Sequence, residues 1–359
     1  MKDIALDLGV SIVTVSKVIR NHPDIAEETR ARVLQRVKEL DYRPNVLARS
    51  LVTGRSYLIG LVVPDLLHPF FAEIAKALST AVRARGYSLI ISSSEEDMAI
   101  EAREIEQLLA RRLDALVIAL TGPSPDVLER IDRMEQPYVL IDRAFPGLAS
   151  NFVGVDDHAA GRLATQHLID QGCRTIAHIR DGENSTGTGR FEGYRQTLLH
   201  NRLSYSDKRV VFRSAVDVDS RHHGAEAMRL LLGQRPRPDA VFCYNDPLAI
   251  GAMNAILDAG LKIPEDIAIV GCGNLHYDDS LRIPLSSVDQ RSQLIGERTA
   301  AILLNIFDSK ARPQPVSVIL DPVLVVRDSS LRNAPPGTAD SRSEPAADKS
   351  SRRKAGTQR

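Results

Sequence analysis

The chain has 359 residues, of which 43% are hydrophobic and 26% are charged, and its formal net charge is zero. This length predicts two or three domains, and the balanced charge excludes a protein that is basic over its whole surface. The three cysteines, Cys173, Cys243 and Cys272, lie far apart, so we expect no disulfide framework, no metal site and no other cofactor. The sequence contains no signal peptide and no run of ~18 apolar residues, which predicts a cytoplasmic protein that does not enter a membrane.

Residues 1–55 predict three short helices with a modest positive charge. They contain ten Lys or Arg and seven Asp or Glu residues, a net charge of +3. Apolar residues at helical spacing predict helices at 2–8, from 10 or 11 to 21, and at 26–40. Asp24 is the predicted N-cap of the third helix.

The first two of these helices have the spacing of a helix-turn-helix, carried by Ala5, Gly9 and Val15. A small residue is needed where the second helix crosses the first, and glycine supplies the positive φ of the tight turn. The second helix would then lie in the major groove of DNA with its first residues against the base edges. This spacing alone also fits two ordinary amphipathic helices.

From Tyr57 onward, apolar runs of strand length alternate with amphipathic helices. This alternation predicts a parallel sheet covered on both faces, and its length favours two such lobes. Strands are predicted at 57–63, 87–91, 115–120, 137–141, 175–179, 240–244 and 267–272. We therefore predict an α/β protein: an all-α helix-turn-helix followed by two doubly wound parallel sheets.

Four sequence stretches together resemble the lactose repressor/purine repressor (LacI/GalR) family of transcriptional regulators. They are VSIVTVSKVIRN, EETRARVLQRVKELDYRPN, ARSL and IGLVVPD, and the resemblance extends from residue 2 to about residue 328. It implies a DNA-binding headpiece (1–42), a hinge helix and linker (43–56), and an effector domain of the periplasmic-binding-protein type (57–328). The lobes would comprise about 57–155 with 286–314, and about 156–285 with 315–328, followed by a disordered basic tail (329–359).

The resemblance also assigns DNA contacts. Bases would be read by Ile12, Val13 and Lys17, and phosphates would be bound by Ser11, Thr14, Ser16 and Asn21. On the hinge helix the implied contacts are Asn45, Ala48 and Leu51, with Leu51 as an apolar wedge in the minor groove. Lys17 stands where the family most often has arginine, and a lysine does not form the planar fork to guanine.

The implied effector site lies between the lobes, at the ends of the strands. Its predicted residues are His68, Phe70, Phe71, Asp142, Arg190, Tyr244, Asn245, Asp246, Asn274 and Gln290. The main alternative for Asp246 is a role as a helix cap. Gly273 stands where the family has an aspartate that accepts hydrogen bonds from the effector. With Arg190 kept and that carboxylate absent, the sequence favours an anionic effector such as a sugar acid or sugar phosphate.

The resulting prediction is a DNA-binding transcriptional repressor that is controlled by a small molecule. A homodimer would place two headpieces on a pseudo-palindromic operator, and the effector would be a sugar, sugar acid or sugar phosphate. Two alternatives remain: a regulator that responds to a purine or nucleoside, and a ligand-binding protein without a DNA role. An enzyme is not predicted, because no nucleophile elbow, P-loop or metal spacing is present.

Overall fold

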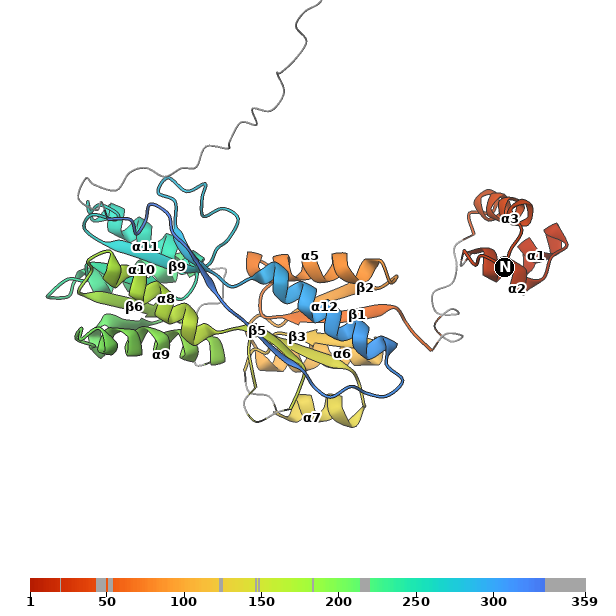
Figure 1. Cartoon of the computed structure of the whole chain (residues 1–359), viewed down its shortest axis with the longest axis horizontal. Coiled ribbons are helices and arrows are strands. Elements are labelled where there is room, and N and C mark those ends of the chain that lie inside the picture. Colours follow the sequence, from red (N-terminus) through yellow and green to blue (C-terminus); the bar gives the residue numbers. More distant parts are fainter. Residues whose placement is uncertain are drawn as a thin grey trace, which may run out of the picture.

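The computed structural model describes residues 1–19, 21–42, 50, 54–122, 125–145, 147, 149–182, 184–213 and 220–332. Within these ranges the chain forms a small helical headpiece and two lobes, each built on a six-stranded sheet (Figure 1). None of the described helices is both long and apolar enough to cross a membrane.

The headpiece contains the three predicted helices, α1 (Lys2–Leu8), α2 (Ile12–Ile19) and α3 (Glu27–Glu39). Gly9 has a φ of 63°, the left-handed conformation predicted for the turn between α1 and α2. Ala5 and Val15 are buried in the headpiece core, which also contains Ile4, Val18 and Val33. The prediction that Asp24 caps α3 is wrong: Ala26 is the N-cap residue, and the Asp24 carboxylate pairs with Lys17 instead.

The N-lobe sheet has the strand order β11-β5-β4-β3-β1-β2, and its strands are parallel. The strands are β1 (Leu58–Val63), β2 (Ser88–Ser93), β3 (Ala115–Ile118), β4 (Tyr138–Ile141), β5 (Phe152–Val155) and β11 (Ser317–Leu320). One face packs against α5 (Pro69–Arg83) and α12 (Ser292–Asp308), and the other against α6 (Met98–Ala110) and α7 (Pro125–Arg133). Helices on both faces explain why the central strands are continuous apolar runs.

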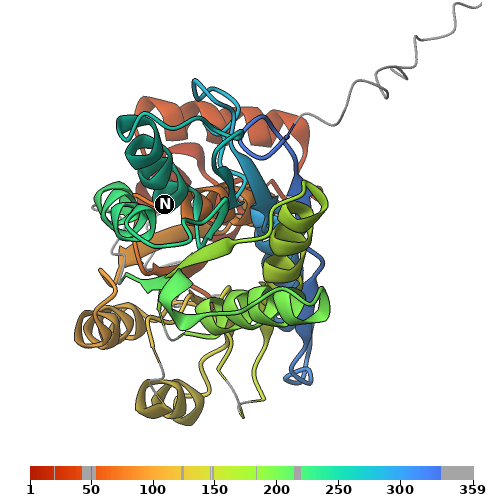
Figure 2. The same ribbon diagram turned by 90° about the vertical axis from the view of Figure 1, so that its left-hand side faces the viewer.

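The C-lobe sheet has the order β12-β10-β9-β8-β6-β7, with only the pairing of β12 antiparallel among its described strands. The strands are β6 (Ile176–Arg180), β7 (Val210–Phe212), β8 (Ala240–Cys243), β9 (Ala268–Gly273), β10 (Ser286–Asp289) and β12 (Val323–Val325). The helices are α8 (Asp157–Asp170), α9 (Ser185–His200), α10 (Ser220–Leu232) and α11 (Asp246–Asp258), with a short 3₁₀ turn, η1 (Asp207–Arg209). Figure 2 shows these helices on both sides of the sheet.

After β10 the chain crosses from the C-lobe to the N-lobe, and after β11 it crosses back, so the predicted lobe boundaries in this part of the chain are wrong. The segment 286–314 was assigned to the N-lobe, but its first part, β10, lies in the C-lobe sheet and only α12 packs on the N-lobe. The segment 315–328 was assigned to the C-lobe, but β11 pairs with β5 of the N-lobe and only β12 returns to the C-lobe sheet. Strands of three or four residues carry too short a pattern to show which sheet they join.

The predicted tail begins too early. Ser329 and Ser330 are fully buried, and the hydroxyl of Ser330 lies 2.7 Å from Nε2 of His167 on α8. Arg332 Nε donates a hydrogen bond of 3.0 Å to the carbonyl of Pro264. Residues 329–332 are therefore part of the C-lobe, and the remainder of the predicted tail lies outside the described residues.

Candidate DNA-binding surface and effector cleft

The first turn of α2 presents apolar side chains to solvent. Ile12 is 44% exposed and Val13 is 63% exposed, while Val15 and Val18 on the opposite face are buried in the headpiece core. The hydroxyl of Ser11 accepts a hydrogen bond of 2.9 Å from Thr14 N, as an N-cap residue does. The first turn of α2 is therefore capped, and its side chains Ile12 and Val13 face outward, as insertion into a major groove requires.

Two of the other predicted DNA-binding side chains are held by neighbours within the headpiece. Lys17 Nζ lies 2.5 Å from Asp24 Oδ2, and the hydrogen bond from Lys17 lowers the pKa of that carboxyl. Asn21 Oδ1 accepts a hydrogen bond of 2.5 Å from Arg30 Nη1. Both contacts are at the surface, where such pairs contribute little stability and rearrange easily. The predicted hinge contacts Asn45, Ala48 and Leu51 lie outside the described residues.

Side chains from both lobes meet where the parallel strands end. The shared cavity measures about 30 Å³, close to the volume of one water molecule, so side chains largely fill the cleft. Eight of the ten predicted effector residues line it: His68, Phe70, Phe71, Asp142, Arg190, Tyr244, Asn245 and Gln290. The sequence analysis missed four further lining residues: Asp65, Glu96, Arg143 and Asp181.

Arg190 is buried at the base of the cleft, and each of its three guanidinium nitrogens donates a hydrogen bond. Nε donates to Asp157 Oδ1 at 2.8 Å, Nη1 donates to the Tyr244 carbonyl at 2.8 Å, and Nη2 donates to Gln290 Oε1. The guanidinium carbon also lies 4.5 Å from the centre of the Tyr244 ring. Burial raises the pKa of Asp157 to about 6 although Arg190 opposes this shift.

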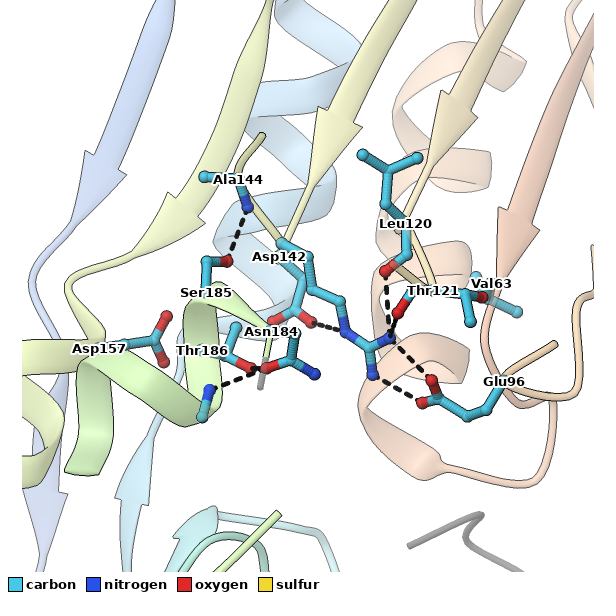
Figure 3. Close-up of polar contacts among 12 residues, drawn as sticks. Val63, Glu96, Leu120, Thr121, Asp142, Ala144, Asp157, Asn184, Ser185 and Thr186 are labelled. Carbon is cyan, nitrogen blue, oxygen red and sulfur yellow. Dashed lines mark hydrogen bonds and ion pairs between the residues drawn. The ribbon is translucent and has the colours of Figure 1, made fainter. Parts of the chain in front are cut away.

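Arg143 is the second buried guanidinium of the cleft, and its two terminal nitrogens are hydrogen-bonded. Its Nη1 and Nη2 donate to the two carboxylate oxygens of Glu96 at 2.9 and 2.6 Å, and Nη1 also donates to the Leu120 carbonyl at 3.0 Å (Figure 3). Asp142 Oδ2 lies 3.7 Å from Arg143 Nε. The sequence signal for Arg143 was its place directly after Asp142 at the end of β4.

His68 enters the cleft as a neutral group. Its Nδ1 accepts a hydrogen bond of 3.2 Å from Phe70 N, which caps α5. Burial, reinforced by the positive charges of Arg190 and Arg143, lowers the pKa of His68 to about 3. The imidazole therefore carries one proton at neutral pH, and because Nδ1 accepts, that proton is on Nε2.

One acceptor and one donor of the cleft, Asp65 Oδ2 and Arg143 Nε, are buried without a hydrogen-bond partner among the described residues. Asp65 Oδ1 accepts a hydrogen bond of 2.7 Å from Leu67 N, but Oδ2 is buried and has no hydrogen-bond partner among the described residues. Burial raises the pKa values of both Asp65 and Asp142. Unpaired buried acceptors and donors are both costly, so the cleft favours a ligand that can donate and accept hydrogen bonds.

Two predicted effector residues, Asp246 and Asn274, do not line the cleft cavity. The Asp246 carboxylate is buried and accepts hydrogen bonds from Ser287 Oγ at 2.6 Å and from Leu275 N at 3.2 Å. Asn274 Oδ1 accepts from Arg327 Nη2 at 2.7 Å. The helix cap of α11 is Asn245, whose Oδ1 accepts from Leu248 N at 2.9 Å. Asp246 and Asn274 therefore stabilise the C-lobe beneath the cleft.

Comparisons with known proteins agree with this architecture. A family model of bacterial regulatory proteins of the lacI family matches residues 1–45, and a model of periplasmic binding proteins and the sugar binding domain of the LacI family matches residues 56–322. The chain is 33% identical over 334 residues to the HTH-type transcriptional repressor PurR of Pectobacterium carotovorum, covering 92% of this chain and 96% of that protein. It is also 33% identical over 335 residues to the ribose operon repressor of Escherichia coli, covering 92% and 99%.

A solved structure, the complex of the transcriptional regulator CelR with cellobiose, is similar over 91% of this chain and 98% of that one. The TM-score is 0.70 and the sequence identity is 29%. Regulators of this kind are not enzymes. The outward-facing helix-turn-helix, the two lobes with exchanged strands and the matches over almost the whole described chain lead to one conclusion. The chain belongs to the LacI family of DNA-binding transcriptional regulators.

Proposed function

We propose that this regulator binds a small, hydroxyl-rich molecule between its lobes, in the cytoplasm, and that this molecule controls repression of its operator. The supporting observation is the state of the cleft: each of its two guanidinium groups is paired with a carboxylate, while the acceptor Asp65 Oδ2 and the donor Arg143 Nε are buried without a hydrogen-bond partner among the described residues. A hydroxyl group both donates and accepts hydrogen bonds, as such a site needs. The similar regulator CelR was solved in complex with cellobiose, which supports a sugar for this chain as well.

An anionic effector, which Gly273 suggested from the sequence, fits this cleft less well. An anion needs a cationic group that is not already neutralised, but the terminal nitrogens of Arg143 make a two-pronged ion pair with Glu96, and Arg190 Nε pairs with Asp157. Asp65 and Asp142 would add repulsion at short range. The neutral sugar is therefore the preferred form of the effector.

A purine effector, suggested by the similarity to PurR, would need an aromatic face on which to stack. The rings of Phe70 and Phe71 instead lie edge to face, with centroids 5.1 Å apart at 71°. The Tyr244 ring is covered by the guanidinium of Arg190. These contacts favour a sugar over a purine.

A ligand panel tests this proposal on the full chain by thermal shift and then by calorimetry. The panel contains neutral mono- and disaccharides, the matching sugar acids and sugar phosphates, and purine bases and nucleosides. We expect a neutral sugar to bind, and we expect Asp65→Asn to weaken that binding about tenfold, because an amide presents one acceptor fewer. Binding of a sugar phosphate or a purine alone would contradict the proposed effector class and leave the DNA-binding role intact.

For the DNA contacts, we propose that Ile12 and Val13 meet thymine methyl groups and that Lys17 meets a guanine or a phosphate. Selection of DNA from a random library by the full chain tests this assignment. We expect a pseudo-palindrome with thymine at the positions nearest Ile12 and Val13. Val13→Ala should relax the preference at one position per half-site, whereas a Leu34→Ala control on the exposed side of α3 should leave the selected sequence unchanged.

We also propose a homodimer that forms through α5 and the edge strand β2. A groove of about 720 Å³ lies along this face, lined by Ala72, Ala75, Leu89 and Ile91. Leu66 and Leu67, which precede α5, are 51% and 72% exposed. Two copies related by a two-fold axis would cover this apolar surface and would set the spacing of the two headpieces. Sedimentation equilibrium tests it: Ala75→Arg should give a monomer, and Ala99→Arg on the exposed face of α6 should not.

A further inference from the structure

The N-terminal end of α12 is attached to the effector cleft. Gln290, which comes just before the helix, accepts a hydrogen bond from the buried guanidinium of Arg190. Arg291 has a φ of 61°, and its amide donates to Asp289 Oδ1 at 2.6 Å, so the chain turns sharply here between the C-lobe sheet and α12. The hydroxyl of Ser292 then donates to Glu73 Oε2 on α5 at 2.5 Å. A change in the position of Arg190 is thereby passed to the first turn of α12.

The body of α12 is packed too closely to bend. A Cβ atom on Gly296 would lie only 2.7 Å from the Ile74 carbonyl and 2.7 Å from Ala77 Cβ, so the backbones of α12 and α5 are in direct contact. Ile295 and Leu303 are fully buried against the N-lobe sheet. With 17 residues the helix is about 25 Å long, and close packing along its length makes it move as one body.

The C-terminal end of α12 meets the chain that arrives from the headpiece. Arg55 Nη2 donates a hydrogen bond of 2.5 Å to the Phe307 carbonyl, and its guanidinium carbon lies 6.0 Å from the centre of the Phe307 ring. The last carbonyls of a helix have no partner within the helix and carry partial negative charge, so they attract a cation. Figure 1 shows α12, in blue, running from the junction of the lobes to the side where the chain enters β1.

The residues after Arg55 are held to a different part of the N-lobe. The Asp114 carboxylate, just before β3, accepts hydrogen bonds from Ser56 N at 2.8 Å, Ser56 Oγ at 2.9 Å and Tyr57 N at 3.1 Å. The segment 55–57 is therefore fixed to the sheet through Asp114 and to α12 through Arg55. A small sliding of α12 over the sheet, together with α5, would pull on Arg55 while Ser56 and Tyr57 stay in place.

We propose that α12 transmits the state of the effector cleft to the headpiece linker and that Arg55 is the positioning residue through which the linker follows it. This inference rests on the proposed function, because it concerns how ligand binding alters DNA binding. Arg55 does not line the effector cleft, so its effect is on the coupling between the cleft and the headpiece. Coupling of this kind typically changes DNA affinity about 5- to 150-fold.

A cross-link between the lobes provides the test without a known effector. Ala144 N of the N-lobe donates a hydrogen bond of 2.9 Å to Ser185 Oγ at the start of α9 in the C-lobe (Figure 3). The double variant Ala144→Cys/Ser185→Cys would join the lobes when oxidised and release them when reduced. Loss of two free thiols verifies the bond, since the native cysteines Cys173, Cys243 and Cys272 are buried.

The measured quantity is the ratio of DNA dissociation constants between the oxidised and reduced forms, on a duplex selected by the full chain. For the double cysteine variant alone we expect a ratio of at least 5-fold in either direction. Adding Arg55→Ala should bring the ratio near one, and adding Arg55→Lys should give an intermediate ratio. The matched control is Arg85→Ala, which removes the ion pair to Asp308 at the same end of α12 without touching the linker, and it should keep the full ratio.

Two results would overturn the proposal: a cross-link that leaves DNA affinity unchanged, or a full ratio that persists in both Arg55→Ala and Arg55→Lys. Either result leaves the proposed function standing, because the selected DNA still binds. A chain that selects no DNA overturns the proposed function itself and this inference with it, and that failure is seen before any cross-link is made.

Discussion

The guanidinium of Arg143 and the carboxylate of Glu96 form a two-pronged ion pair inside the cleft, with contacts of 2.9 and 2.6 Å. Arg143 is almost fully buried, so this pair sets the charge that a ligand meets. The pair explains how a cleft with two arginines can favour a neutral molecule.

Glu96→Gln should increase the affinity of the cleft for anions. The substitution leaves the Arg143 guanidinium without its charged partner, and a sugar acid or sugar phosphate can then supply the missing carboxylate or phosphate. We expect calorimetry to show at least tenfold tighter binding of the anion, about 1.4 kcal/mol. Glu95→Gln is the matched control, since Glu95 is exposed and does not line the cavity, and equal effects of the two variants would contradict this explanation.

Asp24→Asn should strengthen binding to DNA. In the headpiece the Asp24 carboxylate holds Lys17 Nζ at 2.5 Å, so the variant both releases the lysine and removes the negative charge beside it. We expect tighter binding to the selected duplex and a salt dependence that is steeper by about one unit in a plot of log K against log salt. Asp3→Asn changes the net charge equally on α1, and a similar effect from this control would show that Lys17 is not involved.

Much of the fold could be predicted because long helices and strands show a clear spacing of apolar residues. The helix-turn-helix spacing of Ala5, Gly9 and Val15 is local, and the structure confirms it. The short strands β10 and β11 were assigned to the wrong lobes because exchange between sheets depends on tertiary packing. Asp24 was misassigned for a related reason. In sequence, an acidic residue just before a helix can equally be an N-cap or the partner of a basic side chain elsewhere.

Cleft residues could be predicted where they directly follow a strand, as Asp142 and Tyr244 do. Glu96 lies nearer to the end of β2 than His68 lies to the end of β1, and it was missed because only its pairing with Arg143 gives it a role. Asp246 was misplaced because sequence position shows which loop holds a carboxylate but not whether it faces the cleft or the core.

Gly273→Asp should destabilise the protein and should not improve sugar binding. Although the family has an acceptor aspartate at this position, Gly273 has a φ of 145°, and a Cβ atom there would lie 2.6 Å from Asp246 Oδ2. The new side chain would therefore meet a buried carboxylate in a strained backbone conformation.

We expect Gly273→Asp to reduce the free energy of unfolding by roughly 2–4 kcal/mol. Gly273→Ala should reduce it by somewhat less, because it shares the strain but not the charge. Denaturant unfolding of both variants measures the difference. A Gly273→Asp protein that is fully stable and binds a neutral sugar more tightly would show that the C-lobe rearranges to use the aspartate.

Asp278→Asn should stabilise the protein at alkaline pH. Asp278 is fully buried, and burial together with the neighbouring Asp246 raises its pKa to about 9. Between the unfolded pKa of about 4 and this value, the folded chain retains a proton that the unfolded chain has released. The stability of the wild-type protein therefore falls as the pH rises through this window, and an uncharged asparagine removes that loss.

Urea unfolding at pH 5 and pH 8 tests whether the stability of the wild-type protein falls as the pH rises. We expect Asp278→Asn to be more stable than the wild type at pH 8 by roughly 1–3 kcal/mol, with a smaller difference at pH 5. Asp246→Asn provides the contrast, because the Asp246 carboxylate accepts hydrogen bonds from Ser287 Oγ and Leu275 N, and its loss should destabilise the C-lobe at both pH values. An Asp278→Asn protein whose stability falls with pH as steeply as the wild type would place the retained proton on another group.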